Sequence, residues 1–446
     1  MKRKKNILIL AAALLCMFLC TGCVGQSAET LYTLPKQPDE YYDLQNAIDQ
    51  VLGMGAAYSG PLTGSNQQAV QLADLDGDGE DEAIVFVKVS GPKSLKAYIF
   101  DKEAEGTYQN TAVIEGDGSA FDAADYVQID GEPGLEIIVG RQLSEQISQS
   151  LGAYAYREGR LVELMTANYA EYTAVDLDGD DCRDIFILRQ EADDRTGTAE
   201  LYRYSGGQMV REPEVSLSTG AKEIKRMVTG YVSDRVPAVF VASTYSQEEI
   251  VTDIFAFLDG GFRNISSNAE TGLSAQTVRN YNVYAADIDK DGLVELPTPV
   301  ALPSTNAAEE TFWVIDWFNL GVDGQRTTKM TTFHSYQNGW YLELPESWHD
   351  RMTVSRTVTE LDVHGHVFSK WNGRGIEPEE IFTVYAFTGE NRLEQAQAAG
   401  CFLLAEKGET AYAASFGDCP WAKELSQNDL QAMFHFIQVD WNSGEI

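Results

Sequence analysis

Three short segments of the sequence carry acidic side chains at the same alternating spacing. Each has aspartates at its first, third and fifth positions and another acid at its ninth. Alternate carboxylates in a tight loop point towards one centre, and the following acid closes the shell, so we interpret these side chains as cation ligands. They are Asp74, Asp76, Asp78 and Glu82; Asp176, Asp178, Asp180 and Asp184; and Asp287, Asp289, Asp291 and Glu295.

The chemistry of these ligands favours calcium. All of them offer carboxylate oxygen, which suits Ca²⁺ with its six to eight oxygen ligands, and no histidine or cysteine stands where it would favour zinc. Without a cation, the carboxylates of each group would repel one another, and their pKa values would rise. The sequence therefore predicts about three Ca²⁺ ions. The alternative is a solvated Asp-Gly turn that binds no ion.

An EF-hand begins with a similar D-x-D-x-D-G pattern and has to be considered. Its loop needs a bidentate acid at position 12 and a helix on each side. Position 12 is occupied here by Val85, Ile187 and Thr298, and the flanking residues are typical of strands. The sequence therefore excludes an EF-hand.

The acidic segments belong to a repeat. Five segments, which begin at Ala69, Ala123, Glu171, Thr229 and Asn282, read as a short apolar strand, a tight turn and a second β-branched strand. Their equivalent positions are spaced by 54, 48, 54 and 57 residues. The second and fourth turns, at 130–134 and 233–237, lack the ligand spacing. We expect them to be plain turns held by proline and glycine.

A second signature follows each of the first four segments. Aromatic-rich alternating strands flank a turn that contains glycine, as in AYIFDKEAEGTYQ and AYAYREGRLVE, which predicts a hairpin. Each unit then has about four strands, the unit of a β-propeller. We expect a mainly β fold, a propeller of about five to seven blades, with FWVIDWFNLGVDGQ to FHSYQNGWYLELP as a sixth unit. A long β-sandwich with accidental internal similarity is the alternative.

The DLDGDG turns between strands resemble the FG-GAP or VCBS-type calcium-binding repeats of integrin-like β-propellers. The resemblance covers roughly residues 65–310 and is most specific in the acidic turns. It implies a propeller stabilised by Ca²⁺ on an exported protein with a binding or adhesive role. The departures at the second and fourth turns limit the expected number of ions to three.

The N-terminus has the layout of a secretory signal. A basic start, Lys2 to Lys5, precedes an apolar run of 13 residues, Ile7 to Leu19, which is too short to span a bilayer as a helix. The segment resembles a bacterial lipoprotein signal, although Cys20 stands where such signals usually have leucine. The resemblance implies cleavage after residue 22 and lipidation of Cys23, which anchors the protein at the extracytoplasmic face of a cell membrane. A plain signal peptide or short anchor is the alternative.

The remaining chain divides by composition and pattern. After the signal peptide (1–22) we expect a polar tether (23–40), an amphipathic helix (41–56), the propeller (57–345) and a small α+β C-terminal domain (346–446). In the last of these, Ser426 fits the N-cap of a final helix that extends to Ile437. His364 and His366 fall on one face of a strand, where a structural role is favoured over metal binding. Anchor, propeller and C-terminal extension together resemble bacterial lipoproteins with VCBS repeats.

Charge and cysteine content exclude several classes of protein. The chain has 68 acidic and 33 basic residues and a net charge of −35, which becomes −39 once residues 1–22 are removed. Such a charge argues against nucleic-acid binding and against adsorption to anionic lipid. Only Cys182, Cys401 and Cys419 follow the lipidation site, so the protein is not a disulfide scaffold, and a pair between Cys401 and Cys419 stays open.

No catalytic motif accompanies the repeats. The sequence contains no GxSxG elbow, no P-loop and no HExxH. We therefore predict a non-catalytic binding or scaffold module that contacts an extracellular protein or glycan. The alternative is a surface hydrolase or lyase that acts on polysaccharide and uses the propeller as its scaffold.

Overall fold

The computed structural model describes residues 40–102, 106–144, 147–190, 196–246, 249–304, 311–359 and 362–437. The expected signal peptide, most of the tether and Cys23 lie outside these residues. Within them, no helix is both long and apolar enough to cross a membrane.

The described chain is mainly β and forms six antiparallel sheets, which we number in chain order. The first contains β1 (Ala57–Tyr58), β2 (Val70–Ala73), β3 (Glu82–Lys88), β4 (Leu95–Lys102) and β5 (Tyr108–Gly116). The second contains β6 (Ala120–Val127), β7 (Glu136–Ser144), β8 (Ile147–Arg157) and β9 (Arg160–Tyr169). The third contains β10 (Glu171–Val175), β11 (Asp184–Arg189), β12 (Thr198–Ser205), β13 (Gln208–Arg211) and β14 (Val215–Ser216).

The other three sheets follow the same antiparallel pattern. The fourth contains β15 (Ile224–Tyr231), β16 (Pro237–Tyr245), β17 (Glu249–Leu258) and β18 (Gly261–Asn264). The fifth contains β19 (Leu296–Ala301), β20 (Trp313–Leu320), β21 (Arg326–Ser335), β22 (Trp340–Leu344) and β28 (Phe434–Phe436). The sixth contains β23 (Met352–Val358), β24 (His364–Lys370), β25 (Glu379–Thr388), β27 (Thr410–Phe416) and β26 (Phe402–Lys407).

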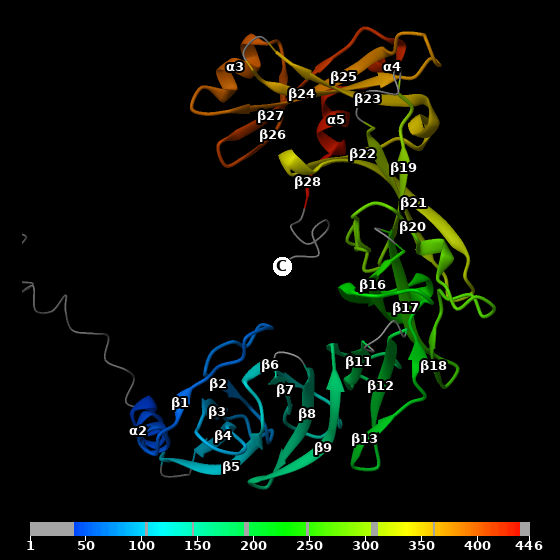
Figure 1. Ribbon diagram of the computed structural model, residues 1–446. Coiled ribbons are helices and arrows are strands. Elements are labelled where there is room, and N and C mark those ends of the chain that lie inside the picture. Colours follow the sequence, from blue (N-terminus) through cyan, green and yellow to red (C-terminus); the bar gives the residue numbers. More distant parts are fainter. Residues whose placement is uncertain are drawn as a thin grey trace, which may run out of the picture.

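Each sheet packs face to face on the next one in the chain. Side chains alternate between the two faces of a strand, so Ile137 and Val139 of β7 enter the core shared with the first sheet, while Ile138 enters the core shared with the third. Further cores join the third sheet to the fourth, the fourth to the fifth and the fifth to the sixth. The sheets therefore follow one another as blades along an arc (Figure 1). The prediction of a mainly β, propeller-like fold is confirmed, although only the second and fourth sheets have four strands and the other four sheets have five.

Helices cover the outer faces of the two end sheets. Leu44, Ile48 and Val51 of α2 (Glu40–Gly53) pack on Val85 and Val87 of the first sheet. At the other end, α3 (Arg392–Ala398) places Ala396 in a small core with residues of β25 and β27 in the sixth sheet. Among the described residues, no hydrophobic cluster joins the first sheet to the sixth. The apolar faces at both ends of the arc are thus withdrawn from water by helices.

The sixth repeat unit expected from the sequence is not a separate sheet. The fifth acidic segment forms only isolated bridges, between Ala286 and Glu295 and between Leu293 and Tyr231 of β15, before β19 begins. Strand β19 then pairs directly with β20, so the acidic segment and the aromatic hairpin of the expected sixth unit belong to one sheet. The sixth sheet is made instead by the C-terminal residues.

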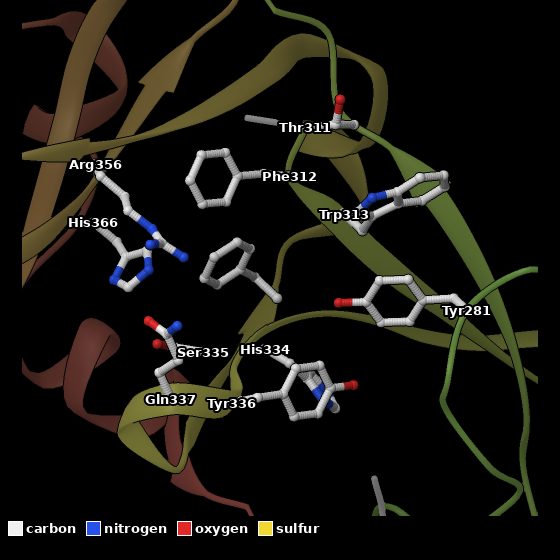
Figure 2. A pocket seen from close by; sticks show the side chains of 11 residues that line it. Tyr281, Thr311, Phe312, Trp313, His334, Ser335, Tyr336, Gln337, Arg356 and His366 are labelled. Atoms are coloured by element: carbon white, nitrogen blue, oxygen red, sulfur yellow. The ribbon is translucent and has the colours of Figure 1, made fainter. Parts of the chain in front are cut away.

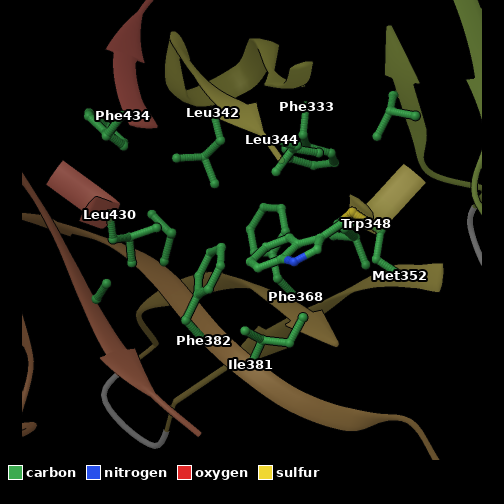
Figure 3. Packing of buried hydrophobic residues seen from close by; sticks show 14 of the residues in the cluster. Phe333, Leu342, Leu344, Trp348, Met352, Phe368, Ile381, Phe382, Leu430 and Phe434 are labelled. Atoms are coloured by element: carbon green, nitrogen blue, oxygen red, sulfur yellow. The ribbon is translucent and has the colours of Figure 1, made fainter. Parts of the chain in front are cut away.

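Residues on both sides of the expected boundary at 345 share one core (Figure 3). Phe333 of β21 lies 5.0 Å from Phe368 of β24, measured between ring centroids. The chain also returns to the fifth sheet at its end, where β28 pairs with β22. The C-terminal segment is therefore packed as the next blade of the arc and also completes the edge of the preceding one.

The final helix is shorter than the sequence predicts. Ser426 caps α5 (Gln427–Met433) and its hydroxyl accepts a hydrogen bond from the backbone N–H of Asp429, as expected for an N-cap. The helix then ends at Met433, because Phe434 to Phe436 pair with β22 instead of continuing the helix. The ring of Phe434 packs 5.5 Å from that of Trp340. Tertiary pairing therefore overrides the apolar helical spacing at these residues.

The three cysteines of the described chain, Cys182, Cys401 and Cys419, are free thiols. The open pairing between Cys401 and Cys419 is therefore not formed in this structure.

Candidate metal centres

Two of the three acidic turns join neighbouring strands of one sheet, and the third immediately precedes the first strand of its sheet. We name them turn 1 (74–82), turn 3 (176–184) and turn 5 (287–295), and the two intervening turns are turn 2 (130–136) and turn 4 (233–237). Turn 1 connects β2 to β3, and turn 3 connects β10 to β11. In each acidic turn, one carboxylate oxygen from each of three aspartates lies within 4.8 Å of the others, so the triplet can hold a metal ion. The triplets are Asp74, Asp76 and Asp78; Asp176, Asp178 and Asp180; and Asp287, Asp289 and Asp291.

Backbone amides fold each turn around its first aspartate. In turn 1 the N–H of Gly77 donates to Asp74 Oδ1 over 2.7 Å, and the N–H of Gly79 donates to Asp74 Oδ2 over 3.1 Å. Turn 3 repeats the first of these bonds, from Gly179 to Asp176 over 2.7 Å. Gly77 has a φ of 78°, which an L side chain rarely adopts. The turns therefore share a backbone design that draws alternate carboxylates together.

The fourth acid of each turn lies apart from its triplet and anchors the turn. One carboxylate oxygen accepts the backbone N–H of the residue that follows the first aspartate. The bonds run from Leu75 to Glu82 (2.7 Å), from Leu177 to Asp184 (3.2 Å) and from Ile288 to Glu295 (3.0 Å). These acids are buried at the start of the next strand. The hydrogen bond that each of these acids accepts ties its turn to the sheet. This role does not require the other carboxylate oxygen to bind an ion.

The electrostatics of the turns reflect a concentration of negative charge. Burial is the main cause that raises the pKa of Glu82 to about 7; the hydrogen bond from the Leu75 N–H opposes this shift, and the charges of Asp76, Asp101 and Asp78 add to it. Burial likewise raises the pKa of Asp184 to about 7 and that of Glu295 to about 7. A bound cation would oppose these shifts, because it favours the charged carboxylate.

Turn 2 differs from the plain turn that the sequence predicts. The guanidinium of Arg157, at the end of β8, lies 2.7 Å from Asp130 and 2.5 Å from Glu136. Glu136 stands at the position of Glu82 and also accepts the N–H of Ile129. An arginine side chain therefore supplies the positive charge of turn 2, where the aspartate spacing is missing. The glycines of turn 2 do adopt positive φ, as a turn held by proline and glycine requires, but the ion pair with Arg157 is a further contact that the sequence did not predict.

The three triplets are not equivalent, because basic side chains of the chain itself reach two of them. In turn 3, Arg203 of β12 contacts Asp178, and its Nε lies 3.6 Å from Asp184. In turn 5, Lys329 Nζ lies 2.8 Å from Asp289 and 2.5 Å from Asp291. Among the described residues, no ion pair involves the triplet of turn 1. Turn 1 therefore carries the least neutralised triplet.

The turns also link neighbouring sheets. The N–H of Leu135 in turn 2 donates to the carbonyl of Asp74 in turn 1 over 3.0 Å. A Cβ added to Gly134 would lie 2.4 Å from the carbonyl oxygen of Leu75, so only glycine allows this approach. The N–H of Val294 in turn 5 donates to Tyr231, which immediately precedes turn 4, over 2.9 Å. An ion held in a turn would thus brace a junction between two blades.

Sequence reasoning identified the acids but missed the basic residues that approach them. Arg157 ends β8 and Arg203 lies within β12, so the two arginines occupy different positions of the repeat, and no common spacing to the acids marks them in the sequence. Lys329 lies on β21, outside the repeated pattern, and only the folded sheet brings it to turn 5. The histidine pair lies apart from the acidic turns. His364 is exposed, while His366 is buried beside Phe333, Phe312 and Trp340.

Comparisons with known proteins add little to this description. No family profile and no curated protein matches the sequence. Among solved structures, rhamnogalacturonan lyase YesW is similar with 13% identity and a TM-score of 0.30, over 73% of this chain and 68% of that one. A rhamnogalacturonan lyase from Bacillus licheniformis gives 11% identity and 0.29 over 71% and 70% of the two chains, and a protein from Lactobacillus plantarum gives 11% and 0.28 over 73% and 86%. Similarity at this level carries neither fold nor function to this chain.

Proposed function

We propose that this protein is a calcium-binding, propeller-like binding or scaffold module that is attached by lipid to the extracytoplasmic face of a cell membrane. The observation that supports it is the recurrence of one aspartate triplet in turns at equivalent places of three sheets. The resemblance of these turns to FG-GAP or VCBS repeats supports the same proposal. The membrane attachment rests on the sequence of residues 1–23.

Calcium suits the donor set better than other common cations. Every triplet offers carboxylate oxygens from a short turn, and Ca²⁺ accepts many oxygen ligands in irregular geometry. Mg²⁺ demands a nearly ideal octahedron and keeps several waters, and zinc prefers nitrogen and sulfur. We assign the proposed ions a structural role, because hydrogen bonds join these turns to the neighbouring sheet.

Calorimetric titration of the protein in detergent tests the proposal. We expect three calcium sites, one for each triplet, that bind Mg²⁺ more weakly. Unfolding temperatures measured with calcium and with a chelator should differ, because ligands of the native state stabilise it by mass action. An identical unfolding temperature in both conditions, together with no heat of calcium binding, would overturn the calcium assignment.

The proposed role is non-catalytic, and the alternative is a hydrolase or lyase that acts on polysaccharide. Glycoside hydrolysis usually needs a pair of carboxylates about 5 to 10 Å apart on either side of the scissile bond. Incubation with a panel of acidic and neutral polysaccharides should release neither reducing ends nor unsaturated products. Catalytic release of either product by the purified protein, lost on heat denaturation, would replace the binding role by the enzymatic one.

A further inference from the structure

One position on a neighbouring strand lies directly beside the fourth acid of each acidic turn. In the third sheet, β11 and β12 pair Ile185 with Tyr202. One residue further along both strands, Arg203 therefore faces Asp184, and its Nε lies 3.6 Å from this carboxylate. Cross-strand neighbours point to the same face of a sheet, with Cβ atoms about 5 Å apart. We name this place, on the strand that pairs with the strand after the turn, the facing position.

The facing position of turn 5 is neutral. Leu296 of β19 pairs with Phe318 of β20, which places Asn319 beside Glu295. The amide of Asn319 donates to Glu295 over 2.6 Å, and both side chains are buried. The strand register therefore accounts for the contact in turn 5 as it does in turn 3.

The facing position of turn 1 is acidic. Ala83 of β3 pairs with Phe100 of β4, which places Asp101 beside Glu82. Burial is the main cause that raises the pKa of Asp101; a backbone hydrogen bond opposes this shift, and the charges of two triplet aspartates add to it. The carboxylate of Asp101 therefore lies within electrostatic reach of the triplet. Asp101 is outside the acidic spacing of the turn, so the sequence pattern does not mark it.

The guanidinium at the facing position of turn 3 already lies among the expected ligands of an ion. Arg203 contacts Asp178 of the triplet, and its Cζ lies 4.2 Å from the ring centroid of Phe257 in the fourth sheet. The other carboxylate oxygen of Asp178, Oδ1, is buried without a hydrogen-bond partner among the described residues. The donor set of turn 3 thus fits a cation, but an incoming ion meets the positive charge of Arg203.

The three facing residues differ in charge. Aspartate, asparagine and arginine give a negative, a neutral and a positive side chain beside acids of the same spacing. The affinity of a Ca²⁺ site depends on the number of charged ligands, and nearby charges add to or oppose it. Lys102, which follows Asp101, contacts Glu80 over 3.4 Å, and Glu80 lies outside the triplet. Turn 1 therefore attracts an ion most strongly.

We propose that the facing position sets the calcium affinity of its turn, so that Asp101 makes turn 1 the tightest site and Arg203 weakens turn 3. Neither residue belongs to an acidic turn, and both act across the sheet. Turn 1 fills first as the calcium concentration rises, and turn 3 needs a higher concentration. The inference rests on the proposed calcium binding and adds the residues that grade the sites.

A pocket of about 140 Å³ between the fifth and sixth sheets is separate from these sites (Figure 2). Trp313, Tyr336 and His366 are among its lining residues, whereas no acid of the three turns and no residue of a facing position lines it. A ligand in that pocket would touch none of the residues considered above. Calcium binding by the turns can therefore be measured independently of it.

Calorimetric titration of the full chain in detergent with calcium tests turn 1 when it is the only unaltered triplet. Asp178→Asn and Asp289→Asn together disable the other two. In this background Asp101→Asn, which reproduces the neutral side chain of turn 5, should weaken calcium binding about ten- to a hundredfold. Asp81→Asn removes an equal charge from an exposed residue of turn 1 outside the triplet. It is the matched control and should change the affinity less than about twofold, because water and salt screen an exposed charge.

The same titration tests turn 3 in a second background, in which Asp76→Asn and Asp289→Asn disable the other two triplets. Here Arg203→Gln should tighten calcium binding about tenfold or more, because the competing charge is removed. Arg183→Gln is the matched control. Arg183 is exposed in the same turn and makes no ion pair among the described residues, so its replacement should change the affinity less than about twofold.

An unchanged calcium affinity on Asp101→Asn would overturn the inference, and so would an unchanged or weaker affinity of a folded Arg203→Gln variant. Unfolding temperatures measured with a chelator establish which variants are folded, and if Arg203→Gln is not, the Asp101 comparison decides alone. Calcium binding that responds to neither change overturns this inference and leaves the proposed function standing. Absence of calcium binding by the unaltered protein overturns the calcium assignment and this inference with it.

Discussion

The guanidinium of Arg157 lies 2.5 Å from the carboxylate of Glu136 in the second sheet. The turn of this sheet lacks the aspartate triplet that the turns of the first and third sheets carry. Glu136 is fully buried, and it accepts the N–H of Ile129 just as Glu82 accepts that of Leu75. The same turn geometry therefore exists with an internal cation in one sheet and with an aspartate triplet in its neighbours. In turn 2 the positive charge comes from the chain itself, whereas in turn 1 we expect a bound cation to supply it.

Replacement of Arg157 by alanine should destabilise the protein in a way that calcium does not repair. The change leaves the buried carboxylate of Glu136 without its ionic partner, and loss of one partner of a buried pair costs about 3 kcal/mol. Urea unfolding, with calcium in excess, measures the loss. Arg160→Ala, an exposed arginine at the start of β9, is the control and should change the free energy of unfolding by less than about 0.5 kcal/mol. Equal stability of the two variants would contradict the role of Arg157.

Asp76→Asn should reduce the stabilisation that calcium gives. Asp76 belongs to the triplet of turn 1, and calcium at about a hundredfold excess over its dissociation constant stabilises the native state by about 2.7 kcal/mol at each site. The variant should lose a contribution of that size and one calcium site. Asp81→Asn is the matched control, since Asp81 lies exposed in the same turn but outside the triplet. Calorimetry counts the calcium sites of both variants. Equal numbers of sites would rule out turn 1 as a calcium site.

The sequence predicts the strands, the blades and the triplets because these features are local. Short continuous runs of apolar, largely β-branched residues indicate β3 and β7, and the aspartate spacing of turn 1 is closed by bonds within five residues. What it could not predict depends on contacts between distant segments. Phe434 leaves the helical pattern because β22 pairs with it, and Lys329 reaches Asp289 across 40 residues of chain. The helices that cover the two ends of the arc likewise find their places only when they pack on the end sheets.

Lys329→Met should raise calcium affinity in turn 5. The ammonium group lies 2.8 Å from Asp289 and 2.5 Å from Asp291, and its hydrogen bonds to these aspartates raise the pKa of Lys329. An incoming ion must displace it. An ion pair at a partly exposed site is worth up to about 1 kcal/mol, so affinity should rise about three- to fivefold. Lys290→Asn is the control. Lys290 lies in the same turn but makes no ion pair among the described residues, so its replacement should change the calcium affinity less. A larger effect of the Lys290 change would contradict the competition.

Acid should destabilise the calcium-bound protein through two buried histidines. Burial lowers the pKa of His334 to about 3 and that of His366 to about 4, whereas both titrate near 6.5 when unfolded. Between these values the unfolded chain binds more protons than the native protein, so stability is fully present above pH 6.5 and falls as the pH drops towards 4. Each histidine should contribute on the order of 1–3 kcal/mol to this loss. His366→Gln should flatten the dependence of the urea midpoint on pH, while His364→Gln, on the exposed end of the same strand, should leave it unchanged. An equal dependence of the midpoint on pH in His366→Gln and in the unaltered protein would contradict the enclosure of this imidazole.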